Sequence, residues 1–297
     1  LPANRFAAVT GLSLLVGLAG AVLGQAPLAA FIDAAGWRSA MLWSGILMAA
    51  IAVLMVPFIR DKPMHAKARE VGSVLGGLAS VLRNPQTWKI AIFTGSLVTP
   101  MAAFAGLFGI PFVQEIYGTS KTTAGATVSL ILIGWGIGGP IAGWLSDRLQ
   151  RRKPVMATGA GILVIAWFVI LTVPMPLLGF QILMFVQGLA SGAVIINFAV
   201  TKESNLPTAT GVAMGLINMA GMATSAASLP LVGWLIDLGW DGTLVDGARL
   251  YGDLAYRQAF AIFPILMGLG FIAALTLRET HCRPLEPVTT RPASPGQ

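Results

Sequence analysis

The chain of 297 residues is too apolar for a water-soluble domain, because 56% of its residues are hydrophobic and only 10% are charged, where an average soluble domain carries roughly 25% charged residues. We therefore predict an all-α integral membrane protein, since backbone groups in lipid must be satisfied within each segment. The net charge of +7 would suit a nucleic-acid partner. The basic residues lie in short loops between apolar runs, however, which favours cytoplasmic loops of a membrane protein and no nucleic acid.

Eight segments are apolar enough to cross a bilayer as helices, which takes roughly 20 residues each. They are 6–31, 38–59, 88–112, 124–145, 155–173, 179–201, 210–236 and 256–277. With these spans, 15 Lys and Arg residues fall on one side and 4 on the other. Basic loops stay inside, so the pattern predicts that both chain ends are cytoplasmic, in a bacterial inner membrane.

The spans divide the chain into four predicted parts. Residues 1–59 hold two spans, and residues 60–87 form a cytoplasmic loop whose second part has apolar residues at helical spacing from Val71 to Leu82. That pattern predicts an amphipathic helix on the membrane surface. Residues 88–277 hold six spans, and residues 278–297 form a polar, Pro-rich tail that we expect to be disordered.

One short stretch, GWLSDRLQRRKP from Gly143 to Pro154, concentrates charge between two apolar runs. Its basic residues favour a cytoplasmic turn. Its aspartate, Asp147, can also lie against a neighbouring helix N-terminus or pair with an arginine. A contact of this kind would break and re-form if helices moved, so we interpret it as a conformational latch made of Gly143, Asp147, Arg148, Arg151 and Arg152.

This stretch resembles the glycine-x-x-x-aspartate-arginine signature of the major facilitator superfamily. The resemblance implies twelve helices in two six-helix halves, with the signature between the second and third helices of each half. Further likenesses lie at LPANRFAAVTG, GWRSAMLW and KESNLPTATGVAMGLINMAG. The resemblance therefore implies that the chain corresponds to helices five to twelve, with residues 1–59 ending the first half and residues 88–277 forming the second. The first four helices are expected to be absent.

The chain departs from the family pattern in two places. Gln150 stands where the family usually has glycine. Proton-driven drug antiporters of the family also carry a fifth-helix pattern in which a glycine-proline pair follows spaced glycines, and here Gln25 occupies the proline position while Pro27 is displaced. This second departure weakens the antiporter interpretation.

No Asp, Glu, Lys or Arg lies near the middle of a predicted span, although such a charge would mark a proton or ion site. A coupling proton or ion, if the protein uses one, is therefore expected to act in other helices, or transport is facilitated. Uncharged polar and aromatic residues are the remaining candidates for lining a solute cavity, with hydrogen bonding between helices as the alternative. They are Gln25, Thr99, Trp135, Gln187, Ser191 and Asn218.

The sequence offers little for catalysis or cofactor binding. It has one cysteine and two histidines, both histidines in polar segments, and so no metal-ligand cluster. The string Gly134–Gly139 resembles a dinucleotide fingerprint, but no strand precedes it. No paired carboxylates or nucleophile–base pair falls within the spans. We predict a protein that is not an enzyme and binds no metal or cofactor.

Taken together, the residues favour a secondary transporter that moves a small solute across the lipid bilayer by alternating access, as a symporter or facilitator. The stretch from Ile116 to Arg148 looks similar to bacterial amino-acid and dipeptide transporters of the family, which favours that substrate class weakly. Two alternatives stay open. One is a drug or metabolite exporter of the same family, and the other is a membrane sensor or scaffold that kept the fold without transport.

Overall fold

The computed structural model describes residues 26–57, 71–245 and 248–283. The chain divides into two compact units, Leu1–Arg69 and Glu70–Gln297. Each unit is considered by itself below. The predicted partition into the two halves of a transporter remains a prediction.

In the first unit, the described residues form helix α2, Ala26–Met55. The helix is kinked at Gly36, whose φ of 80° and ψ of 155° are not helical; glycine adopts a positive φ at no steric cost. The predicted break between the first two spans, at 32–37, thus contains the observed kink. The stretch Ala34–Met55 is long and apolar enough to cross a membrane. Most of the predicted span 6–31 lies outside the described residues.

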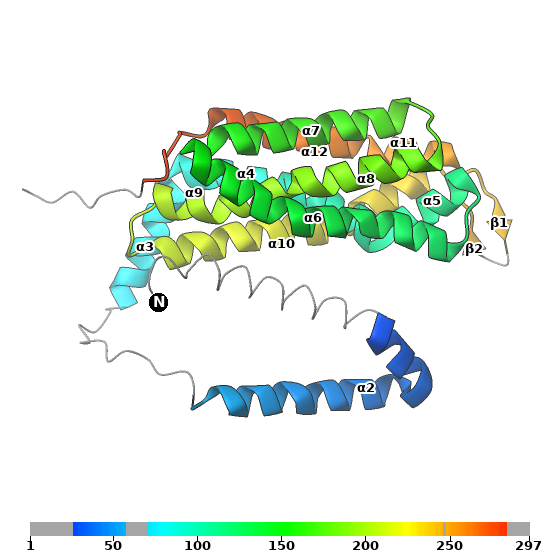
Figure 1. Ribbon diagram of the computed structural model, residues 1–297, viewed down its shortest axis with the longest axis horizontal. Coiled ribbons are helices and arrows are strands. Elements are labelled where there is room, and N and C mark those ends of the chain that lie inside the picture. Colours follow the sequence, from blue (N-terminus) through cyan, green and yellow to red (C-terminus); the bar gives the residue numbers. More distant parts are fainter. Residues whose placement is uncertain (1–25, 58–70, 246–247, 284–297) are drawn as a thin grey trace, which may run out of the picture. The chain divides into compact units, whose positions relative to one another are not determined.

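The second unit is a helical bundle (Figure 1). Its helices are α3 (Val71–Arg83), α4 (Pro85–Pro100), the π-helix η1 (Met101–Phe108), α5 (Gly109–Tyr117), α6 (Lys121–Leu149), α7 (Lys153–Thr172), α8 (Leu177–Ser191), the 3₁₀-helix η2 (Gly192–Ile195), α9 (Ile196–Ser204), α10 (Thr210–Leu238), α11 (Asp253–Phe260) and α12 (Ile262–Thr276). Two strands, β1 (Leu244–Val245) and β2 (Ala248–Arg249), form a short antiparallel hairpin between α10 and α11.

Six stretches of this unit are apolar and long enough to span a membrane. They are Pro85–Tyr117, Lys121–Leu149, Lys153–Thr172, Leu177–Ser204, Thr210–Leu238 and Asp253–Thr276. They coincide with the last six predicted spans and confirm the all-α membrane fold, apart from the small hairpin. The outer surface agrees, because large side chains such as Ile165 and Ile265 are more than 60% exposed, as expected for helices that face lipid.

The spans begin and end where the sequence provides caps. The Asn84 side chain accepts a hydrogen bond from the Gln86 amide at the start of α4, and Ser120 accepts one from the Thr123 amide at the start of α6. Such caps satisfy amide donors that have no partner inside the helix. At the end of α6, Gln150 takes a left-handed conformation with φ of 51°, which is the helix-stop position that favours glycine.

Glycines bring α6 and α8 into backbone contact. A Cβ placed on Gly138 would lie 2.2 Å from the Leu189 carbonyl oxygen, and one on Gly188 would lie 2.2 Å from the Ile131 carbonyl oxygen. Any larger residue would push the helices apart, as expected where small residues drive helix association in lipid. Within α6, Gly134 and Gly138 make this contact, whereas a Cβ on Gly139 or Gly143 would meet nothing within 4 Å.

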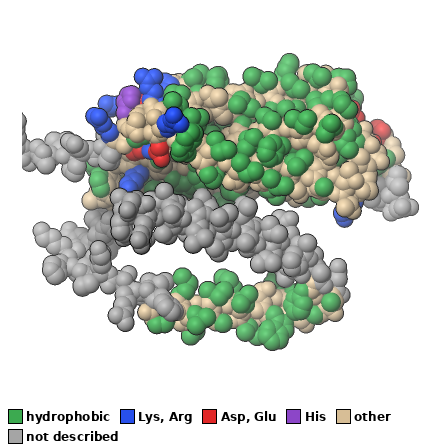
Figure 2. Space-filling model, in the orientation of Figure 1, with side chains coloured by type: hydrophobic (Ala, Val, Ile, Leu, Met, Phe, Trp, Pro, Cys, Tyr) green, Lys and Arg blue, Asp and Glu red, His purple; other side chains and the backbone are tan. Residues whose placement is uncertain are grey.

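The two ends of the bundle differ in composition. One end carries the loop 150–152, the end of α9 and residues 277–283 after α12, and we call it the charged end (Figure 1). The opposite end carries the loop 173–176 and the β-hairpin, and we call it the pocket end. Between them, aromatic rings from η1, α7 and the α11–α12 span form a fully buried cluster centred on Phe104, Trp167 and Phe260. Lys and Arg side chains gather at the charged end (Figure 2).

Candidate functional site: an ionic cluster and a polar helix interface

The loop between α6 and α7 places one arginine inside the protein. Helix α6 ends at Leu149 and α7 begins at Lys153, so Arg152 lies between two membrane spans. It is only 8% exposed. A guanidinium at such a site requires carboxylates and hydrogen-bond acceptors around it, because an unpaired buried charge is costly.

Two carboxylates from different helices meet that requirement. The Arg152 Nη1 atom lies 2.5 Å from Asp147 Oδ1 on the last turn of α6, and its Nη2 atom lies 2.8 Å from Glu203 Oε1 on α9. Nη1 also donates to Ser146 Oγ at 2.7 Å. The two carboxylates are not equivalent, because the Asp147 side chain is 67% exposed while that of Glu203 is 9% exposed.

A third carboxylate joins from the segment after α12. Glu279 accepts hydrogen bonds from the backbone amides of Arg152 and Lys153, at 2.8 and 3.1 Å, and so caps the N-terminus of α7. A negative charge there is favoured by the helix dipole. Its neighbour Thr280 donates to Glu203 Oε2 at 2.5 Å. We call Asp147, Arg152, Glu203 and Glu279 the ionic cluster.

The surroundings keep Arg152 charged. Burial alone would lower the pKa of Arg152, but hydrogen bonds from its guanidinium to Glu203 and Asp147 outweigh burial and hold that pKa above its usual value. Next to the cluster, Cys282 Sγ lies 3.9 Å from the Ser146 carbonyl oxygen. Burial raises the pKa of the Cys282 thiol, and the positive charge of Arg152 offsets part of that effect.

The ionic cluster ties several elements of the charged end together. It joins α6, α7, α9 and the segment after α12 through ion pairs and hydrogen bonds. Desolvation offsets much of the Coulomb attraction in a buried pair. Water can therefore replace these contacts at a modest net cost if the elements separate, whereas removing one partner leaves a buried charge unmatched.

The predicted latch residues are only partly in this cluster. Asp147 and Arg152 bond to each other, and Gly143 accepts a hydrogen bond from Ser146 through its carbonyl oxygen at 3.0 Å. Arg148 and Arg151 point elsewhere: both are exposed, and the Arg148 guanidinium carbon lies 5.2 Å from the centre of the Trp144 ring. Whether the cluster acts as a latch remains a prediction.

Sequence reasoning missed the partners Glu203 and Glu279. A signal for Glu203 was present, because it follows an apolar run directly, at the same membrane edge as Asp147. Nothing local in the sequence indicates Glu279, since its role depends on the segment after α12 returning to the start of α7.

The residues predicted to line a solute cavity lie on four helices. Thr99 (α4), Gln187 and Ser191 (both α8) are at most 5% exposed. Trp135 on α6 is half-buried and Asn218 on α10 is exposed. Thr99 borders a hollow of about 280 Å³ between α4, α10 and α12, together with Ser96 and Ser228. Gln25 lies outside the described residues.

Several buried polar atoms on α4, α8 and α9 have no hydrogen-bond partner among the described residues. They include Thr99 Oγ1, Gln187 Nε2 and Asn197 Oδ1. Asn197 donates through Nδ2 to Thr94 Oγ1 at 2.9 Å, which joins α9 to α4. Unsatisfied buried polar groups are costly, so a water molecule or another polar partner would stabilise these atoms.

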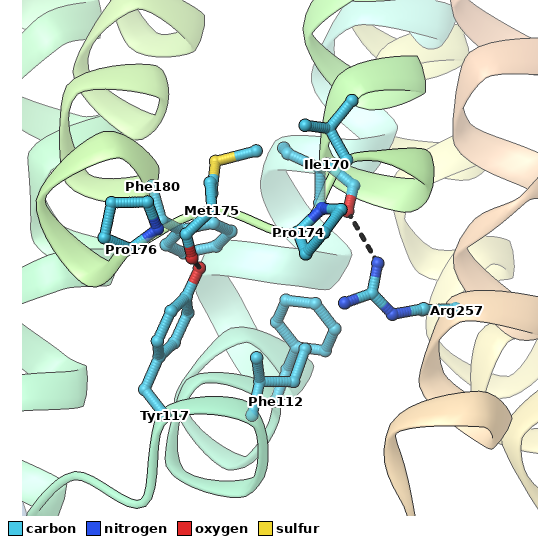
Figure 3. Close-up of a pocket in the computed structure, with 10 residues that line it drawn as sticks. Phe112, Tyr117, Ile170, Pro174, Met175, Pro176, Phe180 and Arg257 are labelled. Carbon is cyan, nitrogen blue, oxygen red and sulfur yellow. Dashed lines mark hydrogen bonds between the residues drawn. The ribbon is translucent and has the colours of Figure 1, made fainter.

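The pocket end contains a separate cavity of about 320 Å³ between α5, the loop 173–176 and α11 (Figure 3). Arg257, which lines this cavity, donates to the carbonyl oxygens of Ile170 and Leu171 at 3.1 and 3.0 Å, and its Nε lies 2.6 Å from Asp253. Tyr117 donates to the Met175 carbonyl oxygen at 3.2 Å. The Arg257 guanidinium and the Tyr117 hydroxyl thus already have hydrogen-bond partners, and the guanidinium caps the end of α7. We therefore interpret these residues as structural and not as a solute-binding site.

Fold and site together define an integral, multi-pass helical membrane protein with an ionic cluster at one membrane edge. Among the described residues, no group of three or more His, Cys, Asp or Glu could hold a metal ion. Comparison with known families then names the class more closely. The model of the Major Facilitator Superfamily matches residues 107–296, more than half of the chain, and the chain belongs to this superfamily.

Individual relatives are distant. The probable nitrate/nitrite transporter NarK2 of Mycobacterium tuberculosis is 29% identical over 127 residues, which cover 43% of this chain and 31% of the relative. The membrane sensor protein UhpC of Salmonella typhimurium is 26% identical over 273 residues, 83% of this chain and 59% of the relative. A probable 4-methylmuconolactone transporter of Cupriavidus pinatubonensis is 26% identical over 240 residues, 78% of this chain and 53% of the relative.

The chain thus spans between 31% and 59% of the length of these relatives. Their names describe two transporters and a sensor, and none describes an enzyme. None of the three names mentions an amino acid or a dipeptide, so the comparison gives that predicted substrate class no support.

Proposed function

We propose that the protein is a secondary transporter that moves a small solute by alternating access, and that the ionic cluster is the latch that closes one side of the path. One observation carries the proposal. A buried arginine between two membrane spans bonds at the same time to carboxylates of α6 and α9, and the segment after α12 binds the same group of residues.

The latch follows from how the cluster would respond to motion. Rocking of helix groups around a central site moves their ends apart on one side of the membrane. Separation of α6 from α9 would pull Asp147 and Glu203 away from the shared Arg152. The two conformational states then differ in the contacts that the cluster makes. A contact can favour one state over the other only if such a difference exists.

The solute is proposed to be small and uncharged or singly charged, and to contact the polar atoms of Thr99 and Gln187 that lack partners among the described residues. The names of the relatives supply the first compounds to test: nitrate, nitrite and 4-methylmuconolactone. An amino acid and a dipeptide complete the panel, because the sequence favours them weakly. A drug or metabolite substrate stays an alternative, and a coupling proton or ion is tested in the same assay by imposing a pH gradient.

Orientation is part of the proposal. The charged end is expected to face the cytoplasm of a bacterial cell, with both chain ends on that side, because Arg and Lys residues concentrate there. Cys282 is the single cysteine of the sequence and lies at this end. A membrane-impermeant maleimide should label it in inside-out vesicles and leave it unlabelled in intact cells; labelling in intact cells reverses the orientation.

The test of transport uses the complete native protein in proteoliposomes. Asp147→Asn and Glu203→Gln should each reduce the initial rate of solute uptake, because each removes a contact that stabilises one of the two states. Asp241→Asn is the matched control, since this exposed residue lies in the loop after α10. If both cluster variants transport at the unmodified rate, the latch is wrong while transport stands. If no panel member is taken up by the unmodified protein, transport of these classes is wrong.

A membrane sensor is the second candidate, and it rests on UhpC, which aligns with 83% of this chain. A sensor would bind solute and change shape without net flux. Tight solute binding to the purified protein, with no uptake of the same solute into proteoliposomes, would favour the sensor over the transporter.

A further inference from the structure

Two of the arginines in the charged loop have no role in the ionic cluster. Arg148 and Arg151 are exposed, and neither forms an ion pair within the described part of the chain. Lys153 contributes its backbone amide to Glu279, and its side chain likewise forms no ion pair there. We call Arg148, Arg151 and Lys153 the basic rim.

Directly beside the basic rim lies an apolar groove of about 380 Å³ between α6, α7 and α8. Its walls include Ala142, Leu145, Leu149, Thr158, Gly159 and Ala193. Small side chains hollow it out, and glycine at 159 is required, because a Cβ there would lie 2.6 Å from the Cβ of Ala193. Hydrophobic side chains cover this face of the protein over α6, α7 and α8 (Figure 2).

The groove and the basic rim are continuous. Leu149 and Pro154 line the groove, and Arg148, Arg151 and Lys153 lie one or two positions from these residues in the chain. Residues three or four apart share a helix face, so Arg148 lies on the side of α6 that carries Leu145. The Arg148 guanidinium lies over the exposed ring of Trp144, the arrangement expected where a membrane helix meets the headgroup layer.

We propose that this groove binds one acyl chain of an anionic diacyl phospholipid, whose phosphate is held by the basic rim. An apolar, narrow groove on the lipid-facing side fits a hydrocarbon chain, and three cations without carboxylate partners complement an anionic headgroup. Basic pockets between membrane helices are known to take such headgroups. Because α6 and α7 carry Asp147 and Arg152 between them, a lipid seated here also braces the two helices that the ionic cluster joins.

The binding test uses the complete native protein in mild detergent and counts bound lipids by native mass spectrometry. Phosphatidylglycerol should bind more tightly than phosphatidylcholine of the same chain length. The double variant Arg148→Gln, Arg151→Gln should weaken phosphatidylglycerol roughly tenfold or more, as each surface cation contributes roughly fivefold, and leave phosphatidylcholine unchanged. Its matched control is Arg278→Gln, Arg283→Gln, which removes the same charge at the same end, away from the groove, and should bind as the unmodified protein does.

A second pair of variants tests the groove. Thr158→Trp fills it, since Thr158 is exposed and lines it. Ile165→Trp places the same ring on the lipid face of α7 outside the groove, where Ile165 is 65% exposed. Thr158→Trp should lower phosphatidylglycerol binding and Ile165→Trp should not.

Four results would overturn the proposal. The first two are equal affinity for the two lipids and an equal loss of phosphatidylglycerol affinity in the Arg148/Arg151 and Arg278/Arg283 variants. The other two are unchanged phosphatidylglycerol binding in Thr158→Trp and equally tight binding of soluble glycerol phosphate, which would make the site one for a free anion. Crosslinking of residue 158 to a second copy in detergent would assign the groove to an interface between copies and would also overturn it.

Discussion

The interior of the bundle and its charged end are held by different forces. In the interior, Phe104 lies 5.3 Å from Trp167 and 5.5 Å from Phe260, ring centre to ring centre, in edge-to-face geometry. At the charged end, about 20 Å away along α7 at 1.5 Å per residue, Arg152 is held by two carboxylates. Water cannot replace the aromatic contacts, but it can replace the ionic ones.

This difference indicates which part of the bundle can move. Helices in lipid associate through close packing, because the apolar environment outside offers no hydrophobic gain. The aromatic cluster provides such packing, and edge-to-face rings add to it. We infer that the aromatic interior keeps the middle of the six spans packed, while their ends at the charged end, those of α6 and α9 among them, make contacts that separate and re-form.

The largest expected effect comes from opening the aromatic interior. Trp167 is 1% exposed and its ring centre lies 4.6 Å from that of Phe263. Trp167→Ala should lower the free energy of unfolding by about 3–5 kcal/mol, the usual cost of removing a large buried aromatic residue. The neighbouring Phe168 is 61% exposed to the lipid face, so Phe168→Ala should cost far less. Reversible denaturation in mixed detergent micelles measures both; equal losses would contradict a packed interior at Trp167.

The next effect separates the two carboxylates of Arg152. Glu203→Gln should lower the free energy of unfolding by about 2–3 kcal/mol, because it removes a buried charge from a buried guanidinium. Asp147→Asn should cost under about 1 kcal/mol, since the Asp147 side chain is 67% exposed and water screens its ion pair. The same denaturation assay compares them. A larger loss in Asp147→Asn would show that the outer carboxylate, and not the inner one, holds the arginine.

Cys282 reports on the cluster without changing it. The thiolate is the reactive form, and burial raises the pKa of this thiol, so alkylation at pH 7 should be slower than for an exposed cysteine and should increase as the pH rises toward that pKa. Glu203→Gln should loosen the surrounding segment and increase the rate at pH 7 several-fold. Maleimide labelling followed over time by mass spectrometry measures the rate, with the modification assigned to the peptide that contains Cys282. A rate that matches a short cysteine peptide at every pH would mean that the thiol is not buried.

The fold could be predicted largely from the sequence because apolar length decides membrane spans. Six spans of the second unit and the span Ala34–Met55 lie where the apolar runs are. The close contact of Gly134 and Gly138 with α8 likewise depends on two glycines four residues apart in one helix. These features are local: they depend on residues within one helix.

The site could be predicted only in part, because its contacts join distant residues. Asp147 and Arg152 lie in one turn, and their pairing could be expected. Glu203 and Glu279 reach Arg152 from 51 and 127 positions away, which no spacing in the sequence reveals. The same holds for the basic rim. The loop predicts a cluster of cations, but only the three-dimensional packing shows that Arg152 forms ion pairs while Arg148 and Arg151 stay exposed.

The smallest expected effect concerns the turn that delivers Arg152 to its partners. Gln150 has a φ of 51°, and this conformation destabilises a residue with a side chain by about 1–2 kcal/mol. Its Nε2 donates a hydrogen bond to the Asp147 carbonyl oxygen at 2.7 Å, which offsets part of that strain. Gln150→Gly removes the strain, loses the exposed hydrogen bond and adds freedom to the unfolded chain, so the free energy of unfolding should rise by only about 0.5 kcal/mol. Gln150→Ala keeps the strain and loses the bond, and should lower it by a similar amount. Denaturation midpoints that fall in the order Gly, Gln, Ala at position 150 would show that the charged end keeps a slightly strained turn. A higher midpoint for Ala than for Gly would show that the turn carries no such strain.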